Sequence, residues 1–270
     1  MKKITCILIV LAMLGLCACV SSKRIVKEND KDLAYEKQEE NEEISEESKE
    51  IEEKEEIKPQ HSEFYMEGCT VDSVLQYYNE VVLATEFSTG DGNPSLVQKW
   101  NIPIRYQVTG NPTDEDLKIL KELFSELNKI NGFPGISEAQ NSGQANLNIY
   151  FYGRQEFNNR FAEFVQTDSA DGAVQYWYDT AGNNIYTADI GYCTDMPSNV
   201  RRSVLLEEVV NGLGLSDSAL RSDSVVYQYS SDVTSLSKMD WLIIKLLYHS
   251  KIKCGMNAAQ CESVIRELYY

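Results

Sequence analysis

The spacing of apolar residues changes along the chain between residues 61 and 270. Segments with apolar residues every three or four positions predict helices, and segments in which they alternate predict strands. The predicted helices cover residues 70–87, 113–130, 198–213, 237–249 and 257–269. The predicted strands are WNIPIRYQV, NLNIYFYG, and a hairpin of GAVQYWYD and NIYTADIG around the turn TAGN. This order indicates an α+β domain with a mixed twisted sheet and flanking helices.

The helix predicted over residues 113–130 has a clear start signal. Thr113 is a typical N-cap residue, and Asp116 follows three positions later, as in a capping box. The apolar residues that follow at helical spacing form a stripe that we expect to be buried. They are Leu117, Leu120, Phe124, Leu127 and Ile130.

Residues 1–18 have the pattern of a lipoprotein signal peptide. Two lysines precede an apolar run that ends at Leu16 and is too short to span a bilayer. The L-C-A-C that follows resembles the bacterial lipobox, in which a cysteine receives lipid and becomes the new N-terminus. We expect lipid on Cys19, because small Ala18 precedes it, whereas bulky Leu16 precedes Cys17; an ordinary cleavage nearby is the alternative. The mature protein is then anchored by lipid to the cell membrane, on its extracytoplasmic face.

Residues 19–60 predict an acidic, disordered tether after the lipidated N-terminus. Between Ser21 and Gln60 there are 15 acidic and 8 basic residues and few apolar ones, so a core stripe or coiled-coil seam cannot form. A lone exposed helix is the alternative. The formal net charge of −17 argues against nucleic acid and anionic lipid as partners. Residues 61–270 remain as one globular domain.

Four cysteines lie in this domain. Outside the cytoplasm an even number suggests two disulfides. Cys254 and Cys261 are close in sequence, which leaves Cys69 to pair with Cys193. Free buried thiols are the alternative reading, and the absence of a C-x-x-C pair disfavours a cysteine-only zinc site.

The stretch EEVVNGLGLSD, residues 207–217, has the spacing of the zinc-protease pattern H-E-x-x-H-x-x-G-x-x-H without its histidines. Glu207, Asn211 and Asp217 occupy the three metal-ligand positions, and Glu208 occupies that of the general base, which makes it the catalytic candidate if any activity remains. Gly214 occupies the position of the turning glycine, and helices also commonly end with a glycine. Asn211 is a poor zinc ligand, and an all-oxygen set would favour a harder ion such as Ca²⁺. We therefore expect no zinc and no cofactor.

The residues downstream resemble those of the metzincin proteases, especially the matrixins. Their S-x-M-Y turn corresponds to Ser224-Val225-Val226-Tyr227, with valine in place of methionine. Their L-x-x-x-D-x-x-x-x-x-x-L-Y closing helix corresponds to LSKMDWLIIKLLY, which contains Asp240. The resemblance implies a zincin-like fold whose motif helix is followed by C-terminal helices.

Most of residues 64–258 also resemble a bacterial family of secreted domains, the domain of unknown function 2927. The shared features include VVLATEF, KWNIPIRYQVTG, the ending LLYHSKIKCGMN, and a box E-E-x-x-(Gln or Asn)-x-L-G-L filled by residues 207–215. In this family the degenerate box is usual. The resemblance implies a fold and no established activity.

Three functional hypotheses follow. The first is a zincin-like domain that has lost zinc proteolysis and binds a peptide or a glycan, with Tyr176, Trp177 and Tyr178 near the binding surface. The second is a peptidase-like hydrolase that uses the carboxylates of residues 207–217. The third is an envelope scaffold. The two histidines, His61 and His249, have no second ligand at helical spacing, and we interpret His249 as a cation at a helix end.

Overall fold

A computed structural model describes residues 62–83, 96–162 and 170–270. The predicted signal peptide, Cys19, the acidic tether and His61 lie outside these residues. The described helices are α1 (Val71–Leu83), α2 (Asp114–Leu127), α3 (Arg154–Phe161), α4 (Arg201–Gly212), α5 (Lys238–Tyr248) and α6 (Ala258–Tyr269). The described strands are β1 (Lys99–Trp100), β2 (Ile104–Gly110), β3 (Ile136–Glu138), β4 (Leu147–Tyr152), β5 (Gly172–Tyr178) and β6 (Asn184–Cys193). None of these helices has the length and apolar character needed to cross a membrane.

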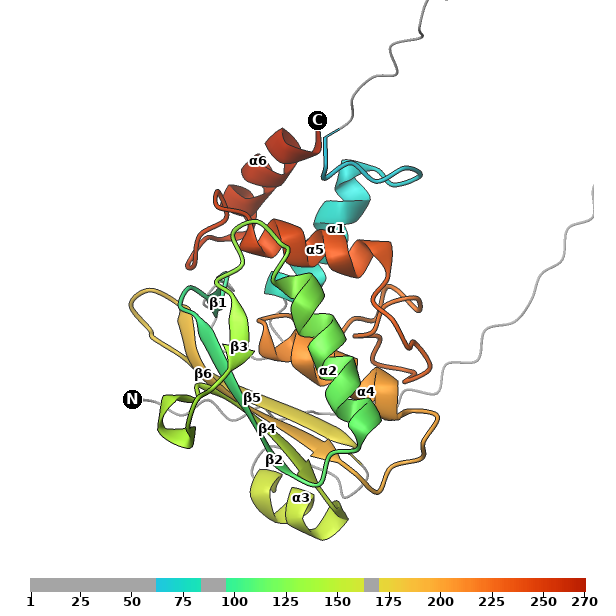
Figure 1. The fold of residues 1–270 in the computed structure, drawn as a ribbon. Coiled ribbons are helices and arrows are strands. Elements are labelled where there is room, and N and C mark those ends of the chain that lie inside the picture. The colour runs from blue at the N-terminus through green and yellow to red at the C-terminus, as the bar shows by residue number, and fades with distance from the viewer. Residues whose placement is uncertain (1–61, 84–95, 163–169) are drawn as a thin grey trace, which may run out of the picture. The chain divides into compact units, whose positions relative to one another are not determined.

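The strands form one mixed sheet (Figure 1). Its parallel part has the order β1-β6-β4-β2-β3, and β5 pairs with β6 in antiparallel orientation, as the predicted hairpin requires. The mixed sheet, its flanking helices and the C-terminal helices are therefore confirmed. The sheet is mostly parallel, and α2 connects the parallel neighbours β2 and β3, so the domain is α/β and the α+β prediction was wrong in this respect. Sequence analysis missed β3 and α3.

The sheet has helices on both faces. On β4 the residues of one face, Leu147, Ile149 and Phe151, are buried in the main core. Gly212 at the end of α4 packs on the same side, against Ile190 of β6. The neighbouring residue on β6, Gly191, faces the opposite side, where the ring of Phe161 from α3 leaves no room for a side chain.

The capping box predicted for α2 is confirmed. The Thr113 side chain accepts a hydrogen bond from the Asp116 backbone N–H, and Asp116 accepts one from the Thr113 N–H. The Asp116 carboxylate is buried, and it also binds Arg201 at the start of α4 and the hydroxyl of Tyr192 at the end of β6. Charge-assisted hydrogen bonds at this point join the starts of α2 and α4 to the sheet.

The end of α4 is fixed by side chains that are distant in sequence. The indole N–H of Trp100 donates to the Gly212 carbonyl at 2.8 Å, and the Tyr248 hydroxyl donates to the Leu213 carbonyl at 2.9 Å. Gly214 then turns the chain with φ +102°, and a Cβ there would lie 2.4 Å from the Gln98 carbonyl oxygen. Both observations require glycine at this position.

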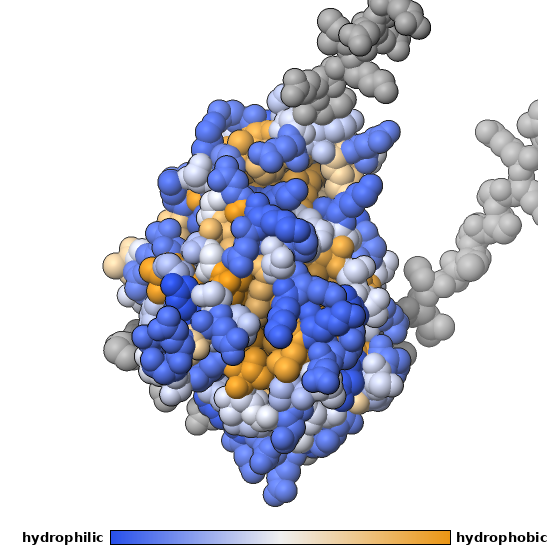
Figure 2. Space-filling view, viewed as in Figure 1, coloured by the Kyte–Doolittle hydropathy of each residue, from blue (hydrophilic) through white to orange (hydrophobic). Residues whose placement is uncertain are grey.

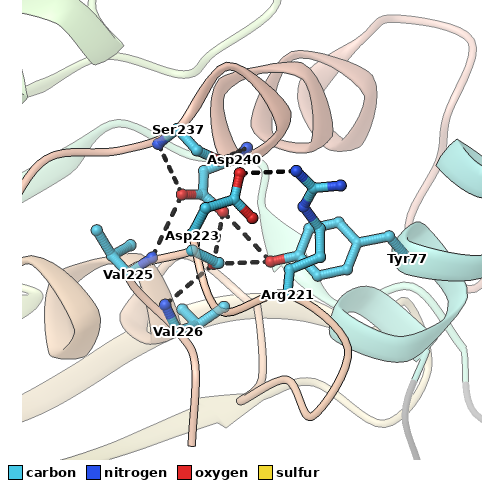
Figure 3. A network of polar contacts seen from close by, with 8 residues as sticks. Tyr77, Arg221, Asp223, Val225, Val226, Ser237 and Asp240 are labelled. Atoms are coloured by element: carbon cyan, nitrogen blue, oxygen red, sulfur yellow. Dashed lines mark hydrogen bonds and ion pairs between the residues drawn. The ribbon is translucent and has the colours of Figure 1, made fainter. Parts of the chain in front are cut away.

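A buried carboxylate, Asp240, holds the segment that follows α4 (Figure 3). It caps α5 together with Ser237, and it accepts hydrogen bonds from the Ser224 hydroxyl at 2.6 Å, the Val225 N–H at 3.3 Å and the Tyr77 hydroxyl at 3.2 Å. Three parts of the chain, namely α1, the turn at residues 224–227 and α5, therefore meet at one carboxylate.

We predict that Asp240→Asn lowers the free energy of unfolding by about 3 kcal/mol, because a buried charged acceptor loses several donors at once. Chemical denaturation of the purified protein measures this change.

Asp223→Asn is the matched control. Its carboxylate lies nearby in Figure 3 but is exposed and paired only with Arg221 among the described residues, so its loss should change stability by less than about 0.5 kcal/mol. Equal effects of the two substitutions would show that the buried network does not stabilise the fold.

Candidate functional site

The residues of the degenerate motif come together in space. Glu207, Glu208 and Asn211 lie on α4, and Asp217 lies in the loop after it. The side-chain N–H of Asn211 donates to Asp217 Oδ1 at 2.9 Å. Burial, together with the nearby charge of Asp217, raises the pKa of Glu207 to about 8. We call these four residues the carboxyl cluster.

The surroundings of the cluster raise the pKa of each of its carboxyl groups. Burial and the charges of Glu207 and Asp217 raise the pKa of Glu208 well above its ordinary value, and only 8% of this residue is exposed. Burial also raises the pKa of Asp217, although the hydrogen bond from Asn211 opposes this effect. Within the described part of the chain, no lysine or arginine forms an ion pair with these carboxyls. With a pKa of about 8, Glu207 is largely protonated in neutral solution.

Glu207 and Glu208 point in different directions, as adjacent helical residues must. Glu208 faces the start of β5, where a Cβ on Gly172 would lie 2.2 Å from its Oε1 atom. Glu207 and Asp217 are half-buried, so solvent and ligands can reach them. The cluster thus has an open side at Glu207 and Asp217 and a closed side under β5.

The loop that carries Asp217 is held by contacts that sequence analysis missed. The Ser218 N–H donates to the Val226 carbonyl at 2.7 Å, which ties the loop to the turn held by Asp240. From α1, the Glu80 carboxylate accepts hydrogen bonds from the Ser218 hydroxyl at 2.9 Å and the Ala219 N–H at 2.8 Å. No local sequence signal marks Glu80, because its partners lie 138 and 139 residues away.

The cluster does not fit a zinc site. Its donors are carboxylate and amide oxygens, whereas zinc in proteins prefers imidazole and thiolate. Across the described segments, no group of three histidine, cysteine, aspartate or glutamate side chains is arranged to hold a metal ion. Asn211 is 8% exposed, and its Oδ1 atom accepts no hydrogen bond from the residues that the structure describes.

The predicted disulfides are not formed, and all four cysteines of the described residues are free thiols. The Cys254 thiol donates to the Lys99 carbonyl, while Cys261 is buried in α6 with its thiol next to Tyr78. Cys69 and Cys193 belong to different parts of the fold: the first precedes α1 beside Tyr269, and the second pairs with Tyr152 at the end of β6. Burial raises the pKa of the thiols of Cys193, Cys254 and Cys261, which keeps them protonated.

His249 ends α5, as expected, but its predicted role as a cation is not supported. Its ring packs edge-on against Phe64, and burial lowers its pKa, so it is largely neutral at pH 7. Of the three aromatic residues at the end of β5, Tyr176 and Tyr178 pack against the core, whereas Trp177 lies on the other face of the strand.

A separate groove of about 580 Å³ lies between α2, α4 and α5. On the side of the molecule that carries α2 and α5, Figure 2 shows hydrophobic patches between hydrophilic side chains. The apolar side chains that line the groove are Ile119, Leu123, Leu206, Leu236 and Trp241. No residue of the carboxyl cluster lines it, so it is not part of the candidate site.

Comparison with known proteins gives a family and no activity. The family model described as a protein of unknown function, DUF2927, matches residues 72–267, which include most of the described residues and the whole carboxyl cluster. The resemblance to this family that was inferred from the sequence is thereby confirmed. No curated protein matches the chain.

We predict that stability falls as pH rises from about 5 to above 8. A carboxyl whose pKa is higher in the folded than in the unfolded state binds more protons when folded, so its favourable contribution is lost as pH rises through the folded value of about 8. In Glu207→Gln this pH dependence should weaken. At pH 8.5 the free energy of unfolding of the variant should exceed that of the natural protein by at least about 1 kcal/mol. Urea denaturation across this pH range measures both effects.

Glu126→Gln serves as the control, because this exposed glutamate of α2 interacts only with Lys129 among the described residues. It should leave the pH dependence unchanged. A natural protein whose stability rises between pH 5 and 8 would show that Glu207 is ionised throughout that range.

Proposed function

The chain belongs to the DUF2927 family, and we propose that its globular domain is a zincin-like binding domain that has lost zinc proteolysis. The signal-peptide pattern and Cys19 support the further proposal that lipid anchors it to the extracytoplasmic face of the cell membrane, with the acidic segment as a spacer. The proposed ligand is an extended peptide.

The observation that carries this proposal is the convergence of the three former metal-ligand positions. Glu207, Asn211 and Asp217 meet at the end of one helix, although they are separated by up to ten residues in sequence. Asn211 is hydrogen-bonded to Asp217, the charge of Asp217 raises the pKa of Glu207, and none of the three residues is a histidine. A zincin-like arrangement with replaced ligands accounts for both facts.

The downstream motif gives independent support for a zincin-like arrangement. Ser224 and Asp240 are the two polar residues that carry the resemblance to the metzincin turn and closing helix. Their side chains are hydrogen-bonded to each other at 2.6 Å in a buried network (Figure 3). The turn at residues 224–227 also pairs with the loop that carries Asp217, through a β-bridge between Tyr227 and Ser218.

The position of β5 favours a peptide ligand. It is the outermost strand on its side of the described sheet, and its first residue, Gly172, touches the carboxyl group of Glu208. Extended peptides commonly bind by adding a strand to such an edge, where backbone hydrogen bonds provide affinity. A glycan would need exposed aromatic faces, and Tyr176 and Tyr178 pack against the core, so of these three aromatic residues of β5 only Trp177 is left for it.

A hydrolase is the second candidate, and it rests on Glu208. This carboxyl is buried beside two other acids, and its raised pKa would keep a proton available for transfer near neutral pH. In this reading Glu208 acts as the general acid and gives its proton to the leaving amine of the peptide.

The test uses fluorescent extended peptides and the purified protein. We predict binding without cleavage, and we predict that N-methylation of alternate peptide bonds weakens binding by at least about tenfold, because strand addition depends on backbone hydrogen bonds. Fluorescence anisotropy measures affinity, and mass spectrometry of the recovered peptide detects cleavage.

Equal affinity for the methylated peptides would contradict strand addition. Cleavage that Glu208→Gln abolishes, with peptide binding retained, would favour the hydrolase instead.

A further inference from the structure

The face of the sheet that is turned away from the main core carries a row of polar side chains. Gln107 of β2 is in register with Asn148 of β4, Asn148 with Asp189 of β6, and Asp189 with Gln175 of β5. Alternate residues of a strand point to opposite faces, and the next residue on β4, Ile149, is buried in the main core. We call the four residues in register the polar row.

The polar row is ordered by a carboxylate. The side chain of Asp189 is 8% exposed, pairs with Arg160 of α3, and accepts a hydrogen bond from the Asn148 side-chain N–H at 2.7 Å. Gln107 donates to Asn148 Oδ1, also at 2.7 Å. Because a carboxylate only accepts hydrogen bonds, Asp189 fixes the orientation of both amides. Side chains that are already held in this way lose little further freedom when a ligand binds.

Part of the polar row is accessible from solvent. On this face α3 packs beyond the row, at one end of the sheet, where the ring of Phe161 lies over Gly191 (Figure 1). Gln107 and Asn148 are half-buried, so a ligand can reach them. In the hydrogen bonds between described side chains Gln107 uses one N–H, which leaves its Oε1 atom and its second N–H for a ligand.

The polar row offers hydrogen bonds and no unpaired charge. The charges of Arg160 and Asp189 neutralise each other. The nearest cation along β2, Arg105, lies beyond the row and donates to the Ser137 hydroxyl on β3. A ligand that complements the row is therefore uncharged and rich in groups that both donate and accept hydrogen bonds. Hydroxyl groups have this property.

An aromatic side chain lies on the same face. Trp177 follows Gln175 by two residues on β5, so both point to the same side of the sheet, and Trp177 is in register with Thr187 of β6. Trp177 is half-buried, so part of its ring is open to solvent. The face of an aromatic ring is negative and attracts the slightly positive C–H groups of a sugar ring.

We infer that this face of the sheet binds a neutral oligosaccharide, with sugar hydroxyls on Gln107 and Asn148 and a sugar ring on Trp177. Because β4 and β6 separate β2 from β5, three strand spacings, or about 14 Å, lie between Gln107 and Trp177 across the sheet. A ligand that contacts both residues therefore has several sugar units.

This site is separate from the proposed peptide site. The helix that carries the carboxyl cluster, α4, packs on the opposite face of the sheet, where Gly212 contacts Ile190. The inference therefore goes beyond the proposed function, and neither depends on the other.

The experiment titrates the full protein with three neutral hexasaccharides: cellohexaose, maltohexaose and hexa-N-acetylchitohexaose. Tryptophan fluorescence and calorimetry measure binding. We expect at least one hexasaccharide to bind with a Kd below about 1 mM, and at least about tenfold more tightly than its disaccharide, because only the longer chain reaches both Gln107 and Trp177. Gln107→Ala and Trp177→Ala should each weaken binding at least about tenfold.

Tyr229→Ala is the matched control for Trp177→Ala. Tyr229 is an aromatic residue in the loop between α4 and α5 and is 70% exposed, so its loss should leave the affinity unchanged. Trp177→Phe keeps an aromatic ring and should bind more tightly than Trp177→Ala, which separates lost stacking from lost folding. Urea denaturation of each variant confirms that it is folded.

The inference is wrong if none of the three hexasaccharides binds at about 10 mM. Binding that is unchanged in both Gln107→Ala and Trp177→Ala would also overturn it, because the sugar would then lie elsewhere on the protein.

Discussion

The candidate site depends on one buried carboxylate that is not part of it. Asp240 fixes the start of α5 and the turn around Ser224, and that turn pairs with Ser218, the residue after Asp217. The position of Asp217 relative to Asn211 therefore depends on a network centred some 20 residues further along the chain. Because the network is buried and fully hydrogen-bonded, it has one arrangement of low energy, and it transmits that arrangement to the loop.

The helix that carries the rest of the cluster is fixed at both ends. Arg201 joins its start to the buried carboxylate of Asp116, and Trp100 and Tyr248 donate to the carbonyls at its end. Helix ends leave carbonyls without partners, and here distant aromatic side chains supply the donors. With both ends held, the orientation of α4 is fixed, which keeps Glu208 buried under β5 and Glu207 half-buried. The contacts that hold α4 in place therefore also keep its acids in the surroundings that raise their pKa.

The sequence predicted what depends on neighbouring residues. The capping box at Thr113 is a contact over three positions, and the closeness of Asn211 and Asp217 follows from helical spacing and one turn. It did not predict contacts over long sequence separations, such as that of Glu80 with Ser218, because no local pattern encodes them. The three-residue strand β3 was too short to show a period, and missing it led to an α+β prediction. The disulfide prediction relied on counting cysteines, and a count contains no information on distance.

The energetics of the cluster favour the proposed binding function over an inert scaffold. Acids buried close together destabilise a fold, and apolar residues of similar volume would pack at the same positions with less cost. The Glu208 side chain is buried against Gly172 of β5, on a helix whose next two residues, Val209 and Val210, are buried and apolar. A scaffold gains nothing from this arrangement. In the proposed function this cost is offset when a peptide binds, because polar groups of the peptide can pair with the carboxyl groups of the cluster.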